Sequence, residues 1–329
     1  MSNKTLLSQL NLAYAPLTAY EFATVKDDPE IEKAMGNASL YIIAQRPVIT
    51  FENVYPDLKS YELKFEIHQE ANENIIYGAL PLIQPIVGSK EEDTIMVSFN
   101  KLDKSNQQDD PPFYGVHGFS LLKDDGRTGE FLIWFSPEKL LQNLWRGYIK
   151  CELEGDLTSL TTYQVHYVGK ATKQSILKRL TGHSTFQDIL SLESPVTEKQ
   201  LPANEIIILP FEFQENLQFQ SFGEESEISE MVAAVKGETY PKQETVFLDA
   251  EKAIIKAIQS EYNKELFKNY PKSKDGLYKD KYNLITYSFC DPITLVYADG
   301  EIKGELSVMG GDAIIIENGK EMKLVKKNT

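Results

Sequence analysis

The sequence predicts an α+β protein in which β-rich regions flank a central segment of alternating strands and helices. Apolar runs between residues 38 and 135 are rich in β-branched and aromatic residues, which favours strands. From residue 146, strand-like runs alternate with runs of helical periodicity. Short strands separated by hairpin-like turns return near the end. The predicted regions are 1–145, 146–280 with an acidic insert at 214–247, and 281–329.

The first region is predicted to contain strands followed by one helix. Ser136 and Pro137 supply an N-cap and a proline at the first helical position, and the helix is expected to end near Trp145. The predicted strands are 40–51, 61–67, 75–86, 94–99, 119–122 and 131–135.

The central and C-terminal elements follow from the same signals. Helices are predicted from Thr172, from Ser184 and from Asp249, and Asp249 is expected to cap the longest of them. The predicted strands are 147–149, 163–168, 205–213, 282–289, 293–297 and 313–317.

Charge and composition narrow the class of protein. The 329 residues carry a net charge of -15, which argues against non-specific coating of nucleic acid and leaves only local contacts. Basic residues gather at 170–179 and at 252–274, whereas residues 212–230 hold six glutamates and no Lys or Arg. The sequence shows neither a membrane span nor a signal peptide, and Cys151 and Cys290 are expected to be reduced thiols, so a cytoplasmic protein is predicted.

The most informative stretch is residues 163–183, YQVHYVGKATKQSILKRLTGH. A strand-like run ends at Lys170, and a helix-like run carries Arg179 and His183 four residues apart. That spacing places both side chains on one face of a helix, where together they could bind one anion. A solvated helix face is the alternative interpretation of the same pair.

Residues 146–275 resemble the GIY-YIG nuclease superfamily, and Tyr167-Val168-Gly169-Lys170-Ala171 resembles its restriction-endonuclease branch. Arg179, His183, Glu251 and Asn263 follow in the order that this family shows. The resemblance implies a small antiparallel sheet flanked by helices. Gly147-Tyr148-Ile149 is a permuted form of the first motif, so Tyr148 is predicted as its tyrosine, with Tyr163 as the alternative.

The resemblance also implies roles for individual residues. Glu251 would hold one Mg²⁺ or Mn²⁺ ion, and Tyr148 would act as general base. Taken alone, Glu251 near a helix start is better explained as a structural acid that offsets the helix dipole. The predicted catalytic residues are Tyr148, Tyr167, Lys170, Arg179, His183 and Glu251, and the predicted substrate-binding residues are Gly169, Lys173, Lys252 and Asn263.

These residues predict a metal-dependent endonuclease that cleaves DNA, in a restriction or phage-defence setting. Two alternatives remain open: an inactive protein of this family that binds a partner, and an RNA-cutting effector. A homodimer or a protein partner bound through the acidic and β-rich regions is also expected. The acidic insert is predicted to keep the enzyme off non-specific DNA by charge repulsion.

Overall fold

The computed structural model describes residues 3–101, 110–198, 200–224 and 226–327, which form two compact units. The first unit comprises Met1–Arg46, Thr162–Ser194 and Pro202–Thr329, and the second comprises Pro47–Thr161 and Pro195–Leu201. The second unit is therefore an insertion into the chain of the first. No helix in the described part of the chain is both long enough and apolar enough to cross a membrane.

The first unit is built on a ten-stranded sheet with the order β15-β14-β11-β3-β12-β1-β13-β16-β17, in which β2 also pairs with β12. Neighbouring strands are antiparallel except for β11 with β14 and β1 with β13. The strands are β1 (Asn3–Leu12), β2 (Leu17–Thr18), β3 (Leu40–Gln45), β11 (Thr162–Lys170), β12 (Ile206–Ser221), β13 (Leu284–Phe289), β14 (Thr294–Tyr297), β15 (Gly300–Lys303), β16 (Ala313–Glu317) and β17 (Glu321–Val325).

Helices pack against this sheet and bury part of its apolar surface. Phe22, Leu177 and Phe186 pack against Tyr41 and Ile208 of the sheet in one buried cluster. A separate helix, α8, packs against β11 and β16. The helices are α1 (Ala19–Val25), α2 (Pro29–Ala34), α4 (Ile176–Thr181), α5 (Ser184–Leu192), α6 (Pro202–Glu205), α7 (Ile228–Val235), α8 (Gln243–Ile258) and the short η3 (Leu277–Asp280).

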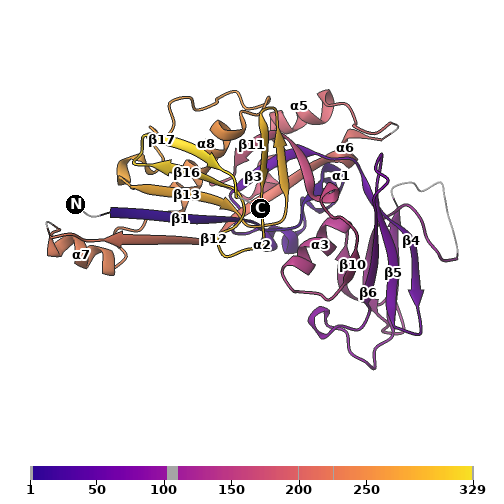
Figure 1. The fold of residues 1–329 in the computed structure, drawn as a ribbon. Helices are drawn as coiled ribbons and strands as arrows, with labels where there is room; N and C mark the ends of the chain where they lie inside the picture. Colours follow the sequence, from indigo (N-terminus) through magenta and orange to yellow (C-terminus); the bar gives the residue numbers. More distant parts are fainter. Residues whose placement is uncertain (1–2, 102–109, 199, 225, 328–329) are drawn as a thin grey trace. The chain divides into compact units, whose positions relative to one another are not determined.

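β1 and β12 form a long antiparallel pair within the sheet, and β1 pairs on its other side with β13. β1 and β12 lie side by side from Asn3↔Ser221 to Leu12↔Phe211, with a register shift between Gln9 and Leu10, and α7 lies near the far end of β12 (Figure 1). The acidic insert predicted at 214–247 thus consists of the outer half of β12, α7 and the start of α8.

The second unit is a seven-stranded sheet with the order β10-β6-β5-β4-β8-β7, in which β9 pairs with β8. Phe51, Phe65, Phe119 and Phe135 are all buried in its core, as β-branched and aromatic strands predict. Its elements are β4 (Ile49–Asp57), β5 (Glu62–Gln69), β6 (Ile75–Pro81), η1 (Pro85–Val87), β7 (Ile95–Lys101), β8 (Val116–Lys123), β9 (Glu130–Phe135), α3 (Pro137–Trp145), β10 (Glu152–Glu154) and η2 (Ser159–Thr161).

The predicted fold class is wrong. The central segment has no small antiparallel sheet of its own, because β11 pairs with β3 from the N-terminal region and with β14 from the C-terminal region. Strands from all three predicted regions therefore form one large sheet. The units also divide the chain after Arg46 and Thr161 rather than at the predicted boundaries after residues 145 and 280.

Individual elements show where the local signals were sufficient. The helix at Pro137–Trp145 is confirmed, and the Ser136 hydroxyl accepts a hydrogen bond from the Lys139 amide. Asp249 does not cap a helix, because α8 begins six residues earlier, at Gln243. The predicted strand at 147–149 is absent from the structure. Both cysteines are free, as predicted.

Candidate functional site

The candidate site lies where β3 pairs with the C-terminal end of β11. Antiparallel pairing sets Tyr41 directly opposite Gly169, and Tyr167 lies two residues earlier on the same strand. A Cβ atom on Gly169 would lie 2.5 Å from a Tyr167 ring carbon and 2.7 Å from both Cζ and Oη of Tyr41. Glycine is therefore required for the two rings to approach, with their centroids 6.1 Å apart.

The Tyr41 side chain is fully buried, at 0% exposure. Its hydroxyl is near enough to Arg179 for that charge to act on its pKa, yet no described group meets the geometry of a hydrogen bond to it. Burial raises the pKa of Tyr41, and it likewise raises the pKa of Tyr167, where Glu251 adds to the effect.

Arg179 and His183 lie on different elements, which corrects the prediction of one shared helix face. Helix α4 ends at Thr181, and His183 is the N-cap of α5, where its Nδ1 accepts a hydrogen bond from the Phe186 amide at 3.1 Å. The His183 ring still lies 5.2 Å from the Tyr167 ring. Burial and the neighbouring Arg179 lower the pKa of His183, so the ring is neutral near pH 7.

Glu251 reaches the site from the third turn of α8 and is 7% exposed. Lys170, the last residue of β11, donates a hydrogen bond to its Oε2 at 2.5 Å. Burial raises the pKa of Glu251, although Lys170 and Lys252 oppose that shift. The carboxylate is thus neutralised by an internal cation.

A pocket of about 270 Å³ opens at this point of the structure. Among its charged groups, Lys170, Lys173 and Arg179 outnumber Glu251, so the pocket is locally cationic in an acidic protein. Guanidinium and ammonium groups are the donors that phosphate oxygens favour. The lining residues are Tyr167, Lys170, Ala171, Thr172, Lys173, Gln174, Arg179 and Glu251.

Two predicted substrate-binding residues instead hold the framework. Asn263 accepts a hydrogen bond from the Val168 amide at 3.0 Å and donates one to the Val168 carbonyl at 2.9 Å, so it braces β11. Lys252 is buried and donates to the Leu248 carbonyl at 2.7 Å and to Asp275 at 3.0 Å. Neither side chain lines the pocket.

The predicted first-motif tyrosine is Tyr148, and the structure places another tyrosine beside Tyr167. Tyr148 belongs to the second unit, is 57% exposed and lies outside any strand. Tyr163 shares β11 with Tyr167, so it cannot supply the neighbouring strand. Tyr41 of β3 occupies that position and was missed. The run Leu40-Tyr41-Ile42 was recognised as a strand, but the inserted second unit separates it from Tyr167 in the sequence.

The oxygen ligands that the pocket offers suit at most one hard cation. Glu251 is the acidic residue that lines the pocket, and the described residues contain no group of three or more His, Cys, Asp or Glu side chains placed to hold a metal. Mg²⁺ is commonly held by one or two carboxylates, with water and substrate phosphate completing its shell. This donor set fits a cation that binds together with substrate.

Comparison with known proteins gives no relative: no family model, no curated protein and no solved structure matches this chain.

Proposed function

We propose that the chain is a metal-dependent endonuclease that hydrolyses phosphodiester bonds in DNA. The observation that carries this proposal is the convergence of Tyr41, Tyr167, Arg179, His183 and Glu251 around Gly169 and one cationic pocket. The GIY-YIG resemblance supports it through the order of Tyr167, Gly169, Arg179, His183 and Glu251 alone; Tyr41 is not part of that resemblance. The phage-defence setting and the cytoplasmic location rest on the sequence alone.

The side chains divide the proposed reaction between them. Arg179 binds phosphate oxygens and stabilises the charge that develops on them. Tyr41 lies buried between Arg179, Tyr167 and His183, and in its phenolate form it would take the proton of the attacking water. Burial raises the pKa of Tyr41 and so opposes the phenolate, whereas the charge of Arg179 favours it. His183, held neutral and fixed as a helix cap, orients the two tyrosine rings. Glu251 would hold one Mg²⁺ or Mn²⁺ ion, which supplies positive charge to the phosphate.

A substrate panel tests the proposal. Duplex DNA, single-stranded DNA and RNA are incubated with Mg²⁺, Mn²⁺ or a chelator, and products are resolved on gels. We expect metal-dependent cutting of duplex DNA that Glu251→Gln abolishes and that Arg179→Ala lowers by about 10²-fold or more. Glu30→Gln and Arg127→Ala, at exposed positions outside the pocket, are the matched controls.

A second candidate is a binding protein with an inactive site. The Lys170–Glu251 ion pair favours it, because the carboxylate that would hold the metal already has a cation. A wild-type protein that cuts none of the three nucleic acids, under any of the metal conditions, would establish this second candidate. Preferential cutting of RNA would instead identify an RNA-directed enzyme.

A further inference from the structure

After Asn263 the chain turns back and follows α8 toward its N-terminal end. Lys256 donates hydrogen bonds to the carbonyls of Lys268 and Tyr270, at 3.3 Å and 2.5 Å. Lys252, one turn earlier, pairs with Asp275 at 3.0 Å. The contacts thus progress along the chain in one direction and along the helix in the other.

Asp249 completes the attachment of this segment. It is 1% exposed and accepts hydrogen bonds from the Tyr270 hydroxyl at 2.6 Å, the Leu277 amide at 2.8 Å and the Tyr287 hydroxyl at 2.8 Å. Asp249, Lys252 and Lys256 are spaced three and four residues apart, so they share one helix face that spans about 10 Å. The segment from 264 to 281 is therefore fastened to α8 at several points along its length.

This lysine segment, residues 264–281, is dense in positive charge. It holds six lysines against Glu265, Asp275 and Asp280, and Asp275 is already paired with Lys252. Some exposed lysines elsewhere in the described chain are paired, as Lys178 is with Glu32 and Lys303 is with Glu301. All six lysines of the segment are exposed and, within the described residues, make no ion pair: Lys264, Lys268, Lys272, Lys274, Lys279 and Lys281.

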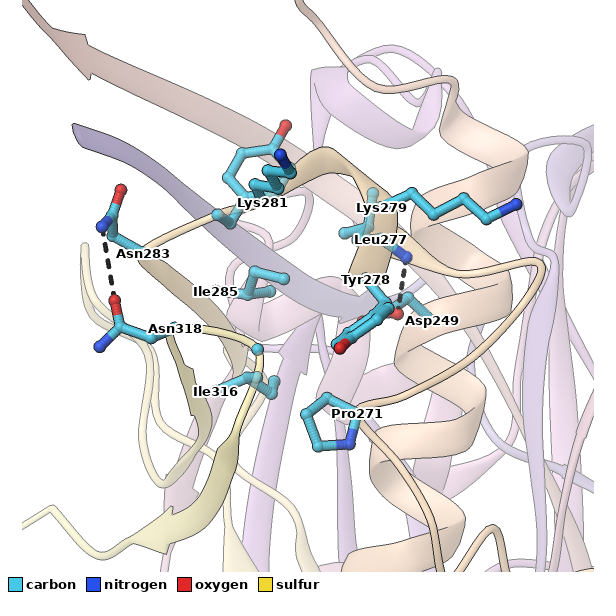
Figure 2. Close-up of a pocket in the computed structure, with 12 residues that line it drawn as sticks. Asp249, Pro271, Leu277, Tyr278, Lys279, Lys281, Asn283, Ile285, Ile316 and Asn318 are labelled. Atoms are coloured by element: carbon cyan, nitrogen blue, oxygen red, sulfur yellow. Dashed lines mark hydrogen bonds between the residues drawn. The ribbon is translucent and has the colours of Figure 1, made fainter. Parts of the chain in front are cut away.

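The far end of the segment borders a hollow of about 410 Å³. Figure 2 shows Lys279 and Lys281 on the turn that follows Leu277, with Asn283 and Asn318 joined by a hydrogen bond across the hollow from them. Ile285 and Ile316 lie beneath. The lysine surface thus continues into a recess whose rim carries ammonium and amide donors.

The segment also reaches the candidate catalytic site. Lys252 directly follows Glu251 in α8, and its partner Asp275 belongs to the segment. Lys170, which is bonded to Glu251, and Lys252 together lower the pKa of Asp275 against the effect of its partial burial. Asp275, the segment residue nearest these groups in the chain of contacts, also acts on the pKa of Glu251, so the segment adjoins the groups proposed to act on the phosphodiester.

We propose that the lysine segment is the surface that binds the sugar-phosphate backbone of duplex DNA and leads it to the Glu251 site. This inference rests on the proposed endonuclease function and names its substrate track. Lysines act as point charges that contact phosphates without reading bases, so the surface confers affinity without sequence preference.

Single-stranded substrates fit this surface less well. Binding of single strands depends on exposed aromatic rings against which successive bases stack. In the segment, Tyr270 is 3% exposed and the Phe267 ring lies against Lys252 at 5.7 Å, which leaves Tyr278 as the exposed ring. One ring gives no continuous stacking platform, and the free charges favour a backbone on the outside of a duplex.

The test measures how DNA affinity depends on salt. Binding of a fluorescent duplex is followed by anisotropy from about 50 to 200 mM salt. The protein carries Glu251→Gln to prevent cleavage. In the segment variant, Lys264, Lys268, Lys272 and Lys274 become glutamine. In the matched control, which has the same net charge, Lys33, Lys236, Lys242 and Lys320 become glutamine; these are exposed and unpaired lysines of the same unit.

We expect the slope of log K against log salt to fall by about 0.9 for each phosphate that the protein no longer neutralises, hence by about 3 to 4 in the segment variant. Adding Lys279→Gln and Lys281→Gln should lower the slope by about 2 more. The control variant should keep the wild-type slope. Circular dichroism melts confirm that each variant is folded.

Equal slopes for the segment and control variants would overturn the inference, as would tighter binding of single-stranded DNA or RNA than of duplex DNA. Cleavage by the protein with native Glu251 is measured in parallel. If that protein cuts DNA while the segment variant binds normally, the substrate track is wrong and the endonuclease proposal stands. If the protein with native Glu251 neither binds nor cuts DNA, both proposals fail.

Discussion

Gly169 controls the approach of two tyrosine rings to the backbone of β11. Replacing it with alanine puts a methyl group within 2.7 Å of atoms in both Tyr41 and Tyr167, so the rings must move apart. Overpacking of this kind costs about 1–3 kcal/mol and displaces the proposed base. We expect Gly169→Ala to lower the melting temperature and to lower DNA cleavage by at least about 10²-fold, because small misplacements are costly in catalysis.

Gly182→Ala is the matched control for this change, because no atom lies within 4 Å of the position that its Cβ would take and it lies in the same α4 region. It should leave both readouts near wild type. Unchanged cleavage by Gly169→Ala would show that the Tyr41–Tyr167 arrangement is not part of a catalytic site.

Tyr41 and Tyr148 are competing choices for the general base, and single hydroxyl deletions separate them. Tyr41→Phe removes a buried hydroxyl that lies beside Arg179 and Tyr167, so the free energy of unfolding should change by no more than about 0.5–1.5 kcal/mol. Cleavage should drop by about 10²- to 10⁴-fold, as expected when a general base is removed. Tyr148→Phe, at an exposed position, should leave cleavage unchanged. If single-turnover assays show the reverse pattern, Tyr148 rather than Tyr41 is the general base.

Glu251 should destabilise the fold at neutral pH. Burial raises its folded-state pKa above the unfolded value of about 4.3, so the folded state holds the proton more tightly. Above the folded-state pKa, Glu251 is charged in both states, and burying that charge lowers the free energy of unfolding. This cost disappears as the pH falls below the folded-state and then the unfolded-state pKa, because the carboxyl is then neutral in both states. Glu251→Gln should raise the melting temperature at pH 7.5 and have little effect near pH 4.

The size of that effect is measurable by calorimetry, because about 1 kcal/mol shifts the melting temperature by about 2–4 °C in chains of 150–250 residues. Glu30→Gln, at an exposed position, serves as the control. A Glu251→Gln protein that melts lower at pH 7.5 would mean that the ion pair with Lys170 outweighs the burial of the carboxylate.

Among the structural elements, β11 depends on a side chain for part of its edge. Its pairing with β14 ends at Gln164, and the Val168 backbone is instead satisfied by the Asn263 amide. We expect Asn263→Ala to lower the free energy of unfolding by about 1–3 kcal/mol, since two buried backbone groups lose their partner. Lys170 follows two residues later, so cleavage should fall as well.

Gln84→Ala provides a comparison, because the buried Gln84 also bonds backbone groups, the Lys150 amide and the Pro81 carbonyl, but in the second unit. It should lower stability without a specific loss of cleavage per folded molecule. Denaturant titrations and single-turnover rates on the same preparations would show whether Asn263 acts through β11.

Strong local signals predicted single elements well, and elements whose ends depend on distant contacts were predicted poorly. The α3 helix was predicted correctly because its start is marked by two adjacent residues, the N-cap Ser136 and Pro137 at the first helical position. In α8, Asp249 looked like an N-cap, but it is a buried acceptor for groups from β13, Tyr270 and Leu277, which the sequence keeps far apart. Composition alone does not distinguish these two uses of an aspartate.

For the whole chain, the order of residues predicted part of the candidate site, and the connectivity of the sheet was out of reach. Tyr167, Lys170, Arg179 and Glu251 lie together at one pocket, as their family-like order suggested. Tyr41 was missed because the second unit is inserted between β3 and β11, so the two paired strands lie far apart in the sequence. No local periodicity reports such a pairing.

The distribution of charge leads to a last prediction. Residues 212–230, on the outer part of β12 and the start of α7, hold six glutamates and no Lys or Arg, while the lysine segment lies at 264–281. Exposed like charges repel DNA over about 10 Å at 0.1 M salt and farther at lower salt. Glutamine at Glu215, Glu224, Glu227 and Glu230 should therefore speed degradation of non-specific plasmid at about 10–20 mM salt, and the gain should vanish near 0.2 M.

The matched control replaces four exposed glutamates of the second unit, Glu73, Glu91, Glu92 and Glu130, and so changes the net charge equally. If both variants accelerate alike, total charge alone explains the effect, because long-range repulsion then does not depend on where the acids lie. If neither variant changes the rate of degradation, the acidic insert does not restrain DNA binding. Acceleration confined to the first variant would show that the acidic insert lies within a Debye length of the path taken by DNA.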